Sequence, residues 1–281
     1  MVDTSSISNF DVGEEIRLMF EPKGMRPATA ATSRNAGQGP YKRLVLRGAT
    51  VIDGTGAPPS GPVDIVVEGG RITELKIVGA PLKTINPANR PASGDHEIDC
   101  HGKYVTPGLI DCHAHVGTPW HGMSGEVPTA DYVYKLWLAH GVTTAREMGS
   151  MNGLGYMLEQ REAAAKNQIA APRLLLHAYF PAVNERIKTI YTPEQARDWV
   201  RRLKQRGADG IKFFGAPPTI MQAALEEAAI QGLRSGCHHA QMAVTRVNAL
   251  TSAKWGLTSS EHYYGIPEAL FENRIVQNFS D

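Results

Sequence analysis

Two histidines separated by one residue, His113 and His115, follow a Pro-Gly turn at 107–108. Residues 109–115 are typical of a short strand, in which side chains two residues apart share a face. Asp111, His113 and His115 therefore point the same way, and two imidazoles in this arrangement can hold one metal ion. A pair of buried structural histidines is the alternative, but the Pro-Gly turn and the carboxylate on the same face favour the metal site.

Further candidate ligands follow at regular spacing. They are Lys212 in the apolar run 207–214, the adjacent His238 and His239, and His262 at the end of a predicted short strand. His115 and Lys212 are 97 residues apart, Lys212 and His239 are 27 apart, and His239 and His262 are 23 apart. One strand-helix unit of a (β/α)8 barrel averages about 31 residues, so these gaps correspond to about three, one and one units. The ligands are therefore predicted on strands 1, 4, 5 and 6, at the strand ends where such barrels carry their chemistry.

The combination of Pro-Gly-Leu-Ile-Asp-Cys-His-Ala-His, Gly-Ala-Asp-Gly-Ile-Lys, the strand-5 histidine and Ser-Glu-His resembles the amidohydrolase superfamily of metal-dependent hydrolases. The resemblance runs from about Tyr41 to the end of the chain. It implies a binuclear centre, in which the His-x-His pair holds one ion, the histidines of strands 5 and 6 hold the other, and a carboxylated lysine on strand 4 bridges them. Those roles fall on His113, His115, His239, His262 and Lys212. His238 remains an alternative to His239, which is preferred because His-Ala-Gln is closer to the family's His-Ala-x pattern.

The expected cofactors are two divalent, zinc-like ions and carbon dioxide bound as a lysine carbamate. Two such ions about 3.5–4 Å apart lower the pKa of a bridging water towards 7, and the resulting hydroxide attacks a carbonyl so that a C–N bond breaks. Lys212 and His262 are the expected catalytic residues. The apolar neighbours of Lys212 favour its deprotonated amine, the form that can react with carbon dioxide. A buried lysine paired with a carboxylate is the alternative interpretation.

Substrate-binding candidates lie near the same strand ends. They are His177 and Tyr179 on one face of the predicted strand 173–179, His121 in a Gly-rich loop, and Tyr263 after His262. His177 is equally compatible with a core histidine. The neighbouring Arg146 and Glu147 are expected to form an ion pair with each other.

The composition is that of an ordinary soluble protein, with 281 residues, a net charge of +1 and 42% hydrophobic residues. This charge gives no reason to expect nucleic acid or an anionic membrane as a partner. No run of 18 apolar residues and no secretory signal is visible. The three cysteines are too few and too scattered for a disulfide framework. A cytoplasmic location fits this composition. The resemblance implies a homo-oligomer that acts on a small amide or peptide-like substrate.

Three regions differ in character. Residues 1–40 are expected to be a partly disordered extension, with one short helix around 14–20. Residues 41–105 are β-rich, with Asp53 and Asp64 expected in turns, and the resemblance implies that they are part of the family's β-sandwich. Residues 106–281 alternate strands and helices, which predicts an α/β fold of the (β/α)8 barrel type.

Several barrel elements have clear boundaries in the sequence. Strands are predicted at 142–148 and 173–179, and a helix of strong formers at 223–229. Thr192-Pro-Glu-Gln195 opens another helix with a capping box, and Gly207 ends it. The helix before residue 142 is expected to bury Val133, Leu136 and Trp137. The segment from residue 102 onwards provides about six units. Strands 7 and 8, the closing strands of the sandwich and the strand-8 aspartate of the family are then missing, so a partial chain with a complementing C-terminal segment is expected.

Four hypotheses about function remain open. The first is a binuclear amidohydrolase. The second is a mononuclear deaminase of the same superfamily, against which Lys212 argues. The third is a non-catalytic or incomplete subunit that needs a second polypeptide, and the fourth is a coincidence of fold alone.

Overall fold

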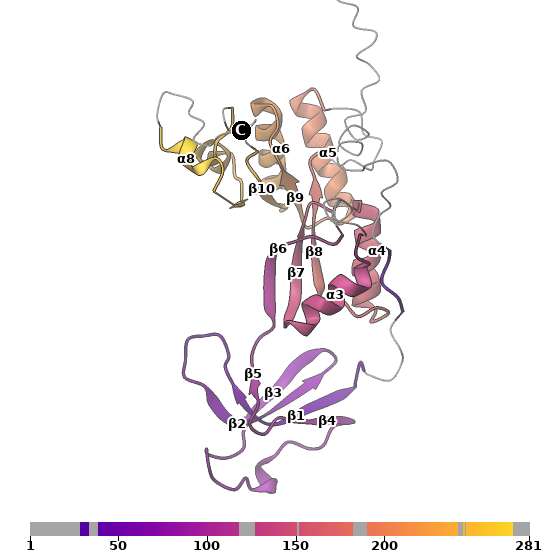
Figure 1. The fold of residues 1–281 in the computed structure, drawn as a ribbon, viewed down its shortest axis with the longest axis vertical. Coiled ribbons are helices and arrows are strands. Elements are labelled where there is room, and N and C mark those ends of the chain that lie inside the picture. Colours follow the sequence, from indigo (N-terminus) through magenta and orange to yellow (C-terminus); the bar gives the residue numbers. More distant parts are fainter. Residues whose placement is uncertain are drawn as a thin grey trace, which may run out of the picture. The chain divides into compact units, whose positions relative to one another are not determined.

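The computed structural model describes residues 29–33, 39–117, 127–150, 152–181, 190–240, 244 and 246–271. The chain divides into two compact units. One comprises Arg34–Leu109, and the other comprises Met1–Ser33 with Ile110–Asp281 (Figure 1). The helix expected around residues 14–20 lies outside the described residues.

The smaller unit contains one five-stranded mixed sheet among its described residues. Its strands are β1 (Arg43–Val51), β2 (Ser60–Glu68), β3 (Arg71–Ile77), β4 (His96–Asp99) and β5 (Tyr104–Val105). The order is β3-β2-β1-β4, and β5 also pairs with β1. Strand β2 pairs antiparallel with both β1 and β3, whereas β4 and β5 run parallel to β1. The β-sandwich stays a prediction.

Asp64 does not serve a turn, so that expectation was wrong. It lies inside β2 and is fully buried. Its carboxylate accepts the Gly48 N–H at 2.7 Å and pairs with Nη1 of Arg47 at 3.0 Å. A buried charge is tolerated when it is paired and hydrogen-bonded, and Arg47 on the neighbouring strand meets that need. Asp53 does lie in a turn, where it accepts the Thr55 N–H.

The larger unit is built on a six-stranded sheet with the order β11-β10-β9-β8-β7-β6. Its strands are β6 (Leu109–Ala114), β7 (Val142–Met148), β8 (Arg173–Tyr179), β9 (Gly210–Phe213), β10 (Arg234–Cys237) and β11 (Ser259–Ser260). The pairs from β7 to β11 are parallel. The predicted strands 142–148 and 173–179 are confirmed at both ends.

A helix follows each of these strands, as the alternating pattern predicts. They are α3 (Ala130–Ala139), α4 (Leu154–Ala165), α5 (Pro193–Arg206), α6 (Pro218–Ile230), α7 (Ala249–Lys254) and α8 (Ile266–Ala269). Helix α5 has the predicted capping box between Thr192 and Gln195 and ends at Gly207, whose φ of 90° suits glycine. None of the helices in the described part of the chain combines the length and the apolar character needed to cross a membrane.

The six-stranded sheet is curled into a half-barrel. Strands β6 and β11 stand at opposite ends of the strand order, so in a flat sheet they would lie about 24 Å apart. Yet Nδ1 of His113 on β6 is 2.6 Å from Oε2 of Glu261, the residue that follows β11. This contact across the interior brings the C-terminal ends of the first and last strands together.

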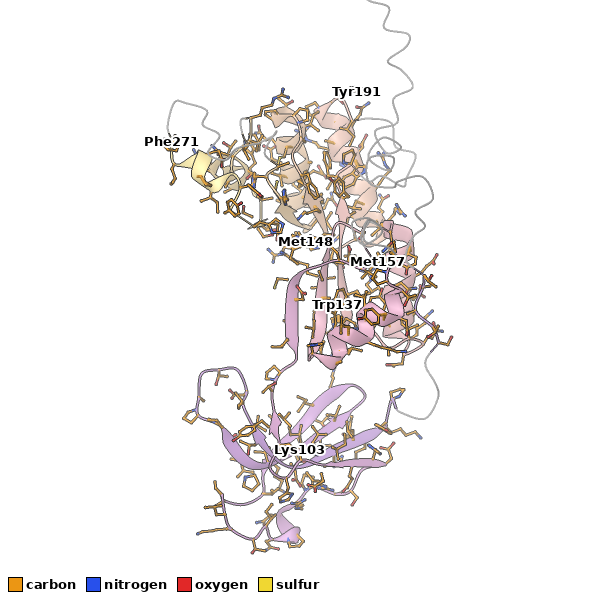
Figure 2. All side chains as sticks on the ribbon, viewed as in Figure 1. Lys103, Trp137, Met148, Met157, Tyr191 and Phe271 are labelled. Carbon is orange, nitrogen blue, oxygen red and sulfur yellow. The ribbon has the colours of Figure 1, made fainter. Side chains whose placement is uncertain are left out.

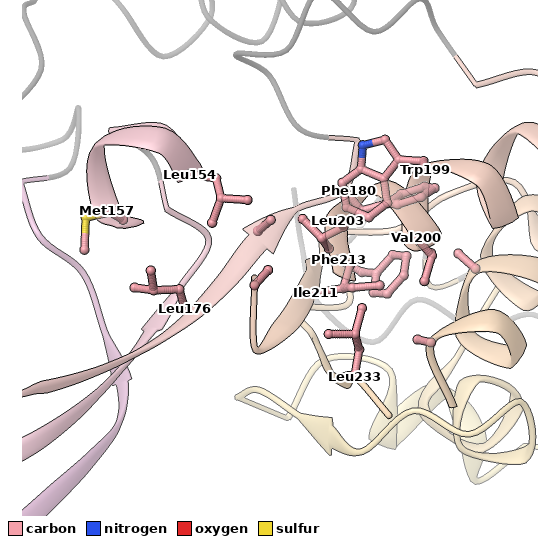
Figure 3. Packing of buried hydrophobic residues seen from close by; sticks show 14 of the residues in the cluster. Leu154, Met157, Leu176, Phe180, Trp199, Val200, Leu203, Ile211, Phe213 and Leu233 are labelled. Atoms are coloured by element: carbon pink, nitrogen blue, oxygen red, sulfur yellow. The ribbon is translucent and has the colours of Figure 1, made fainter. Parts of the chain in front are cut away.

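The core lies between the sheet and its helices. Trp199 of α5 packs edge-on against Phe180, with 5.0 Å between ring centroids, and Phe180 contacts Phe213 of β9 at 4.8 Å (Figure 3). Helix α3 buries the stripe Ala130, Val133 and Tyr134, with Trp137 partly buried beside the core. The expectation that Leu136 is buried was wrong. Leu136 is 43% exposed because it lies off the stripe at i, i+3, i+4 and i+7.

The described part of the N-terminal extension lies against the larger unit. The carbonyl oxygen of Thr29 accepts the first N–H of α3, from Ala130, at 2.9 Å. The N–H of Ala31 donates to Oε1 of Gln160 on α4 at 3.2 Å. Residues 29–33 are therefore held at the helices that follow β6 and β7.

Candidate metal centre

Four imidazoles and one amine gather at the C-terminal ends of the strands. His113 contacts the rings of His115 and His262, with centroids 5.1 and 4.4 Å apart. The His262 ring lies 4.9 Å from that of His238. Nζ of Lys212 is 3.4 Å from Nε2 of His113. Met148, labelled in Figure 2, marks the C-terminal end of β7 at this edge of the sheet.

The two adjacent histidines after β10 face different surroundings. His238 stacks on Phe214 at 5.0 Å and faces His262. His239 is buried, and its Nε2 lies 2.9 Å from Oγ of Ser252 on α7. His239, the preferred candidate ligand, is therefore directed towards α7, and His238, the alternative, lies with the other imidazoles. Strand β10 ends at Cys237, so the alternation of a strand did not determine which of the two histidines faces inward.

Lys212 occupies a dry position on β9. Its side chain is fully buried, as are Ile211 and Phe213, and its ammonium lies 5.3 Å from the ring centre of Phe214. Burial lowers the pKa of Lys212 to about 8, against the opposing influence of Glu261. Within the described residues, no carboxylate lies at ion-pair distance from Lys212, which disfavours the interpretation as a paired structural lysine. A substantial fraction of its amine is therefore neutral near pH 7.5.

Three of the four imidazoles favour the uncharged form. Burial lowers the pKa of both His113 and His238 to about 4, and the positive charge of Lys212 adds to the effect at each. Burial is also the main cause that lowers the pKa of His262, and the positive charge of Lys212 adds to it. Neutral imidazoles offer the lone pair that a divalent cation binds. Among the residues that the structure describes, no three His, Cys, Asp or Glu side chains converge tightly enough to enclose an ion as they stand. The chemistry of the donor set nevertheless fits a metal such as zinc.

Glu261 is a site residue that the sequence analysis did not single out. It is only 7% exposed, and its Oε1 accepts bonds from Nη2 of Arg146 at 3.1 Å and Oγ of Ser259 at 2.8 Å. Burial raises the pKa of its carboxyl group, but hydrogen bonds with His113 and Ser259 outweigh burial and lower the pKa overall. The available signal was its place in Ser-Glu-His, but its partner His113 is 148 residues away in sequence.

The expected ion pair between Arg146 and Glu147 was wrong. Consecutive residues of a strand point to opposite faces, so the two side chains on β7 diverge. Arg146 turns to Glu261 and to the carbonyl oxygen of Cys112. Glu147 is fully buried, accepts the Ser150 N–H and lies 3.7 Å from Nδ1 of His115.

The backbone of His262 is strained. Its φ of 114° lies in a region that residues with a Cβ rarely adopt. Such a conformation costs about 1–3 kcal/mol and persists only where the surroundings impose it. The hydrogen bonds of Glu261 on one side and the ring contacts of His262 itself supply those surroundings.

The predicted substrate-binding residues differ in their burial and in their contacts. Tyr179 stacks on Phe214 at 4.9 Å beside Lys212, and burial raises its pKa. His177 is 2% exposed, and within the described residues neither of its ring nitrogens has a hydrogen-bond partner. Tyr263 is 56% exposed and contacts Tyr264 at 4.4 Å. His121 lies outside the described residues.

The comparisons with known proteins agree with this geometry. A sequence profile of the amidohydrolase family matches residues 104–245, about half of the chain. The chain is 32% identical over 108 residues to a 5-methylthioadenosine/S-adenosylhomocysteine deaminase of Desulforudis audaxviator, covering 38% of this chain and 23% of that protein. It is 39% identical over 79 residues to a dihydroorotase of Trichlorobacter lovleyi, covering 27% and 15% respectively.

A solved structure supports the fold. A Xaa-Pro dipeptidase with methionine bound in its active site superposes with a TM-score of 0.57 at 21% identity, covering 78% of this chain and 61% of that one. In the sequence comparisons, the chain matches less than a quarter of the length of each of the two relatives named above. The profile match, the half-barrel and the histidines at its strand ends together show that this chain belongs to the amidohydrolase family.

Proposed function

We propose that this chain carries the metal centre of a hydrolase that cleaves a C–N bond in an amide, peptide or cyclic amide. The observation that carries the proposal is the gathering of His113, His115, His238 and His262 near the buried amine of Lys212, which lies 3.4 Å from His113 and whose pKa burial lowers to about 8. The sequence relatives, which are named as a deaminase and a dihydroorotase, support the same class of chemistry.

The ligand roles follow from which imidazoles lie together. His113 and His115 would hold one divalent ion, and His238 and His262 the other, with His238 in place of the initially preferred His239. When bound, divalent ions polarise a carbonyl oxygen and lower the pKa of a water molecule. Lys212 would bridge them after modification by carbon dioxide.

Lys212 would be modified by a direct reaction of its amine with carbon dioxide. The neutral amine donates its electron pair to the carbon of carbon dioxide, so that an N–C bond forms while one C=O π bond opens and its electrons move to oxygen. One N–H bond then breaks and the proton passes to water. The product is an anionic carbamate with two oxygens, which suits a bridge between cations. Burial assists the step because it raises the fraction of neutral amine.

The neighbouring aromatic side chains suit a substrate with an apolar group. Tyr179 and Phe214 form a stacked pair next to Lys212, and the exposed Tyr263 follows His262. A small amide or peptide-like molecule would place its apolar part against these rings.

A mononuclear deaminase is the second candidate, favoured by the named activity of one relative. It would need one ion and no bridging lysine, so the buried position of Lys212 favours the binuclear reading. The number of ions per chain separates the two.

The first test is elemental analysis of the purified protein after equilibration with zinc and bicarbonate, followed by turnover assays on a dipeptide, a hydantoin and an aryl amide. We expect two zinc ions per chain, one in His262→Asn, and no turnover in Lys212→Ala. His140→Asn, at an exposed histidine after α3, is the matched control and should keep both ions. One ion per chain would favour the deaminase, and none would overturn the proposal.

The assignment of His238 needs its own pair of variants. His238→Asn should lose one ion per chain. His239→Asn should keep both ions but unfold at a lower urea concentration, because its bond to Ser252 is lost. The reverse pattern of ion loss would restore His239 as the ligand.

A further inference from the structure

Both imidazoles of the His-x-His pair have Nδ1 directed at a buried carboxylate. Nδ1 of His113 is 2.6 Å from Oε2 of Glu261, and Nδ1 of His115 is 3.7 Å from Oε1 of Glu147. The two carboxylates come from different elements, the segment after β11 and the end of β7. A buried carboxylate therefore lies near Nδ1 of each imidazole, at hydrogen-bond distance from His113 and just beyond it from His115.

The first carboxylate is held firmly in place. Arg146 and Ser259 both donate to Oε1 of Glu261, which leaves Oε2 for His113. Arg146 is itself fixed, because its Nε donates to the carbonyl oxygen of Cys112, the residue before His113. These hydrogen bonds therefore fix the Glu261 carboxylate with Oε2 directed towards the imidazole of His113.

The second carboxylate has an unused acceptor. The Ser150 N–H occupies Oε2 of Glu147, and Oε1 has no hydrogen-bond partner within the described residues. Nδ1 of His115 is likewise buried without such a partner in the same part of the chain. Leaving two buried polar atoms unpaired is costly, and these two atoms are only 3.7 Å apart.

A carboxylate at Nδ1 determines which nitrogen of a neutral imidazole carries the proton. The ionised carboxylate only accepts, so the N–H sits at Nδ1 and Nε2 keeps its lone pair. The surroundings of His113 fit this arrangement, since Nζ of Lys212, a donor, lies 3.4 Å from Nε2. We propose that Glu261 and Glu147 are positioning residues that hold His113 and His115 in the Nδ1–H tautomer and present both Nε2 atoms to the centre. The proposal rests on the proposed function only where metal affinity is concerned.

The tautomer can be measured without any metal. Long-range 1H–15N spectra of the metal-free protein distinguish the two tautomers by their ring nitrogens, and the signals are assigned by their loss in His113→Asn and His115→Asn. We expect the Nδ1–H form for both residues, and for Glu261→Gln a mixture of tautomers at His113 alone. An Nε2–H form of His113 in the unsubstituted protein would overturn the proposal, whether or not the protein binds metal.

Metal affinity supplies the second measurement. Glu261→Gln and Glu147→Gln should each weaken zinc binding by roughly 10–100-fold in competition with a chelator, the usual effect of removing such a partner. Glu227→Gln is the matched control, because Glu227 is also buried and paired with an arginine, Arg201 at 3.1 Å, but lies on α6 outside the site. It should leave zinc affinity unchanged. A zinc affinity equal to that of the unsubstituted protein in all three variants would refute the positioning role. Absence of zinc binding in the unsubstituted protein would refute the proposed function, and the tautomer measurement would then decide whether Glu261 and Glu147 position the imidazoles.

Discussion

Replacing Lys212 by methionine should stabilise the metal-free protein while abolishing the proposed hydrolase activity. The pKa of Lys212 falls from 10.5 to about 8 because the folded protein disfavours its charged form. At about 1.4 kcal/mol per pKa unit, this corresponds to about 3 kcal/mol of folding free energy lost at pH 7. Methionine has a similar length and no charge, so Lys212→Met should recover up to about 3 kcal/mol, less any cost of repacking.

The pH dependence gives the sharper test. Between pH 8 and 10.5 the unfolded chain binds more protons at Lys212 than the folded chain does, so the stability of the unsubstituted protein rises with pH in that window. Well below pH 8 both states are protonated and the penalty reaches its full value. The advantage of Lys212→Met should therefore be largest at pH 7 and should shrink towards pH 10.5.

Urea denaturation of the metal-free proteins in buffers free of carbon dioxide measures both effects. Lys204→Met, at an exposed lysine of α5, is the control and should show no such change with pH. A Lys212→Met protein that is less stable than the parent at pH 7, with a difference that does not depend on pH, would refute the argument that burial depresses the pKa of this amine.

Three further predictions concern stability, each measured by urea denaturation. Asp64→Ala should cost about 1–3 kcal/mol, because it removes the buried acceptor of the Gly48 N–H and of Nη1 of Arg47, although Arg47 keeps Glu97 at 2.6 Å, and an unchanged midpoint would contradict the role given to this carboxylate. Thr192→Ala removes the capping box of α5 and should cost about 1 kcal/mol, whereas Thr55→Ala in an exposed turn should cost much less. Gly210→Ala should cost about 1–3 kcal/mol, since a Cβ there would collide with the ring of His177 and the carbonyl oxygen of Arg234, and full stability would show that His177 can move aside.

The barrel elements with strong local signals could be predicted from the sequence. The strands β7 and β8 and the capping box at Thr192 depend on alternation and on short-range hydrogen bonds, which one sequence displays. The gathering of His113, His115, Lys212 and His262 followed from spacing together with the family resemblance.

The sequence-based predictions that were wrong or incomplete have two physical causes. Some features depend on partners far away in the chain, as with Glu261 and His113, and no local pattern identifies such a pair. Others depend on where regular structure stops. His238 and His239 could not be told apart because β10 ends at Cys237, after which the period of two no longer applies. The pairing of Arg146 with Glu147 is different, since strand alternation already argued against it.

The contact between His113 and Glu261 has a consequence for how this unit folds. It closes a loop whose ends are 148 residues apart in sequence. The chain entropy lost in closing so long a loop cannot be recovered by one polar contact, so this contact is expected to form only after the intervening strands have paired. The centre is then assembled late, and a ligand that binds only the completed centre adds its binding free energy to the stability of the whole half-barrel.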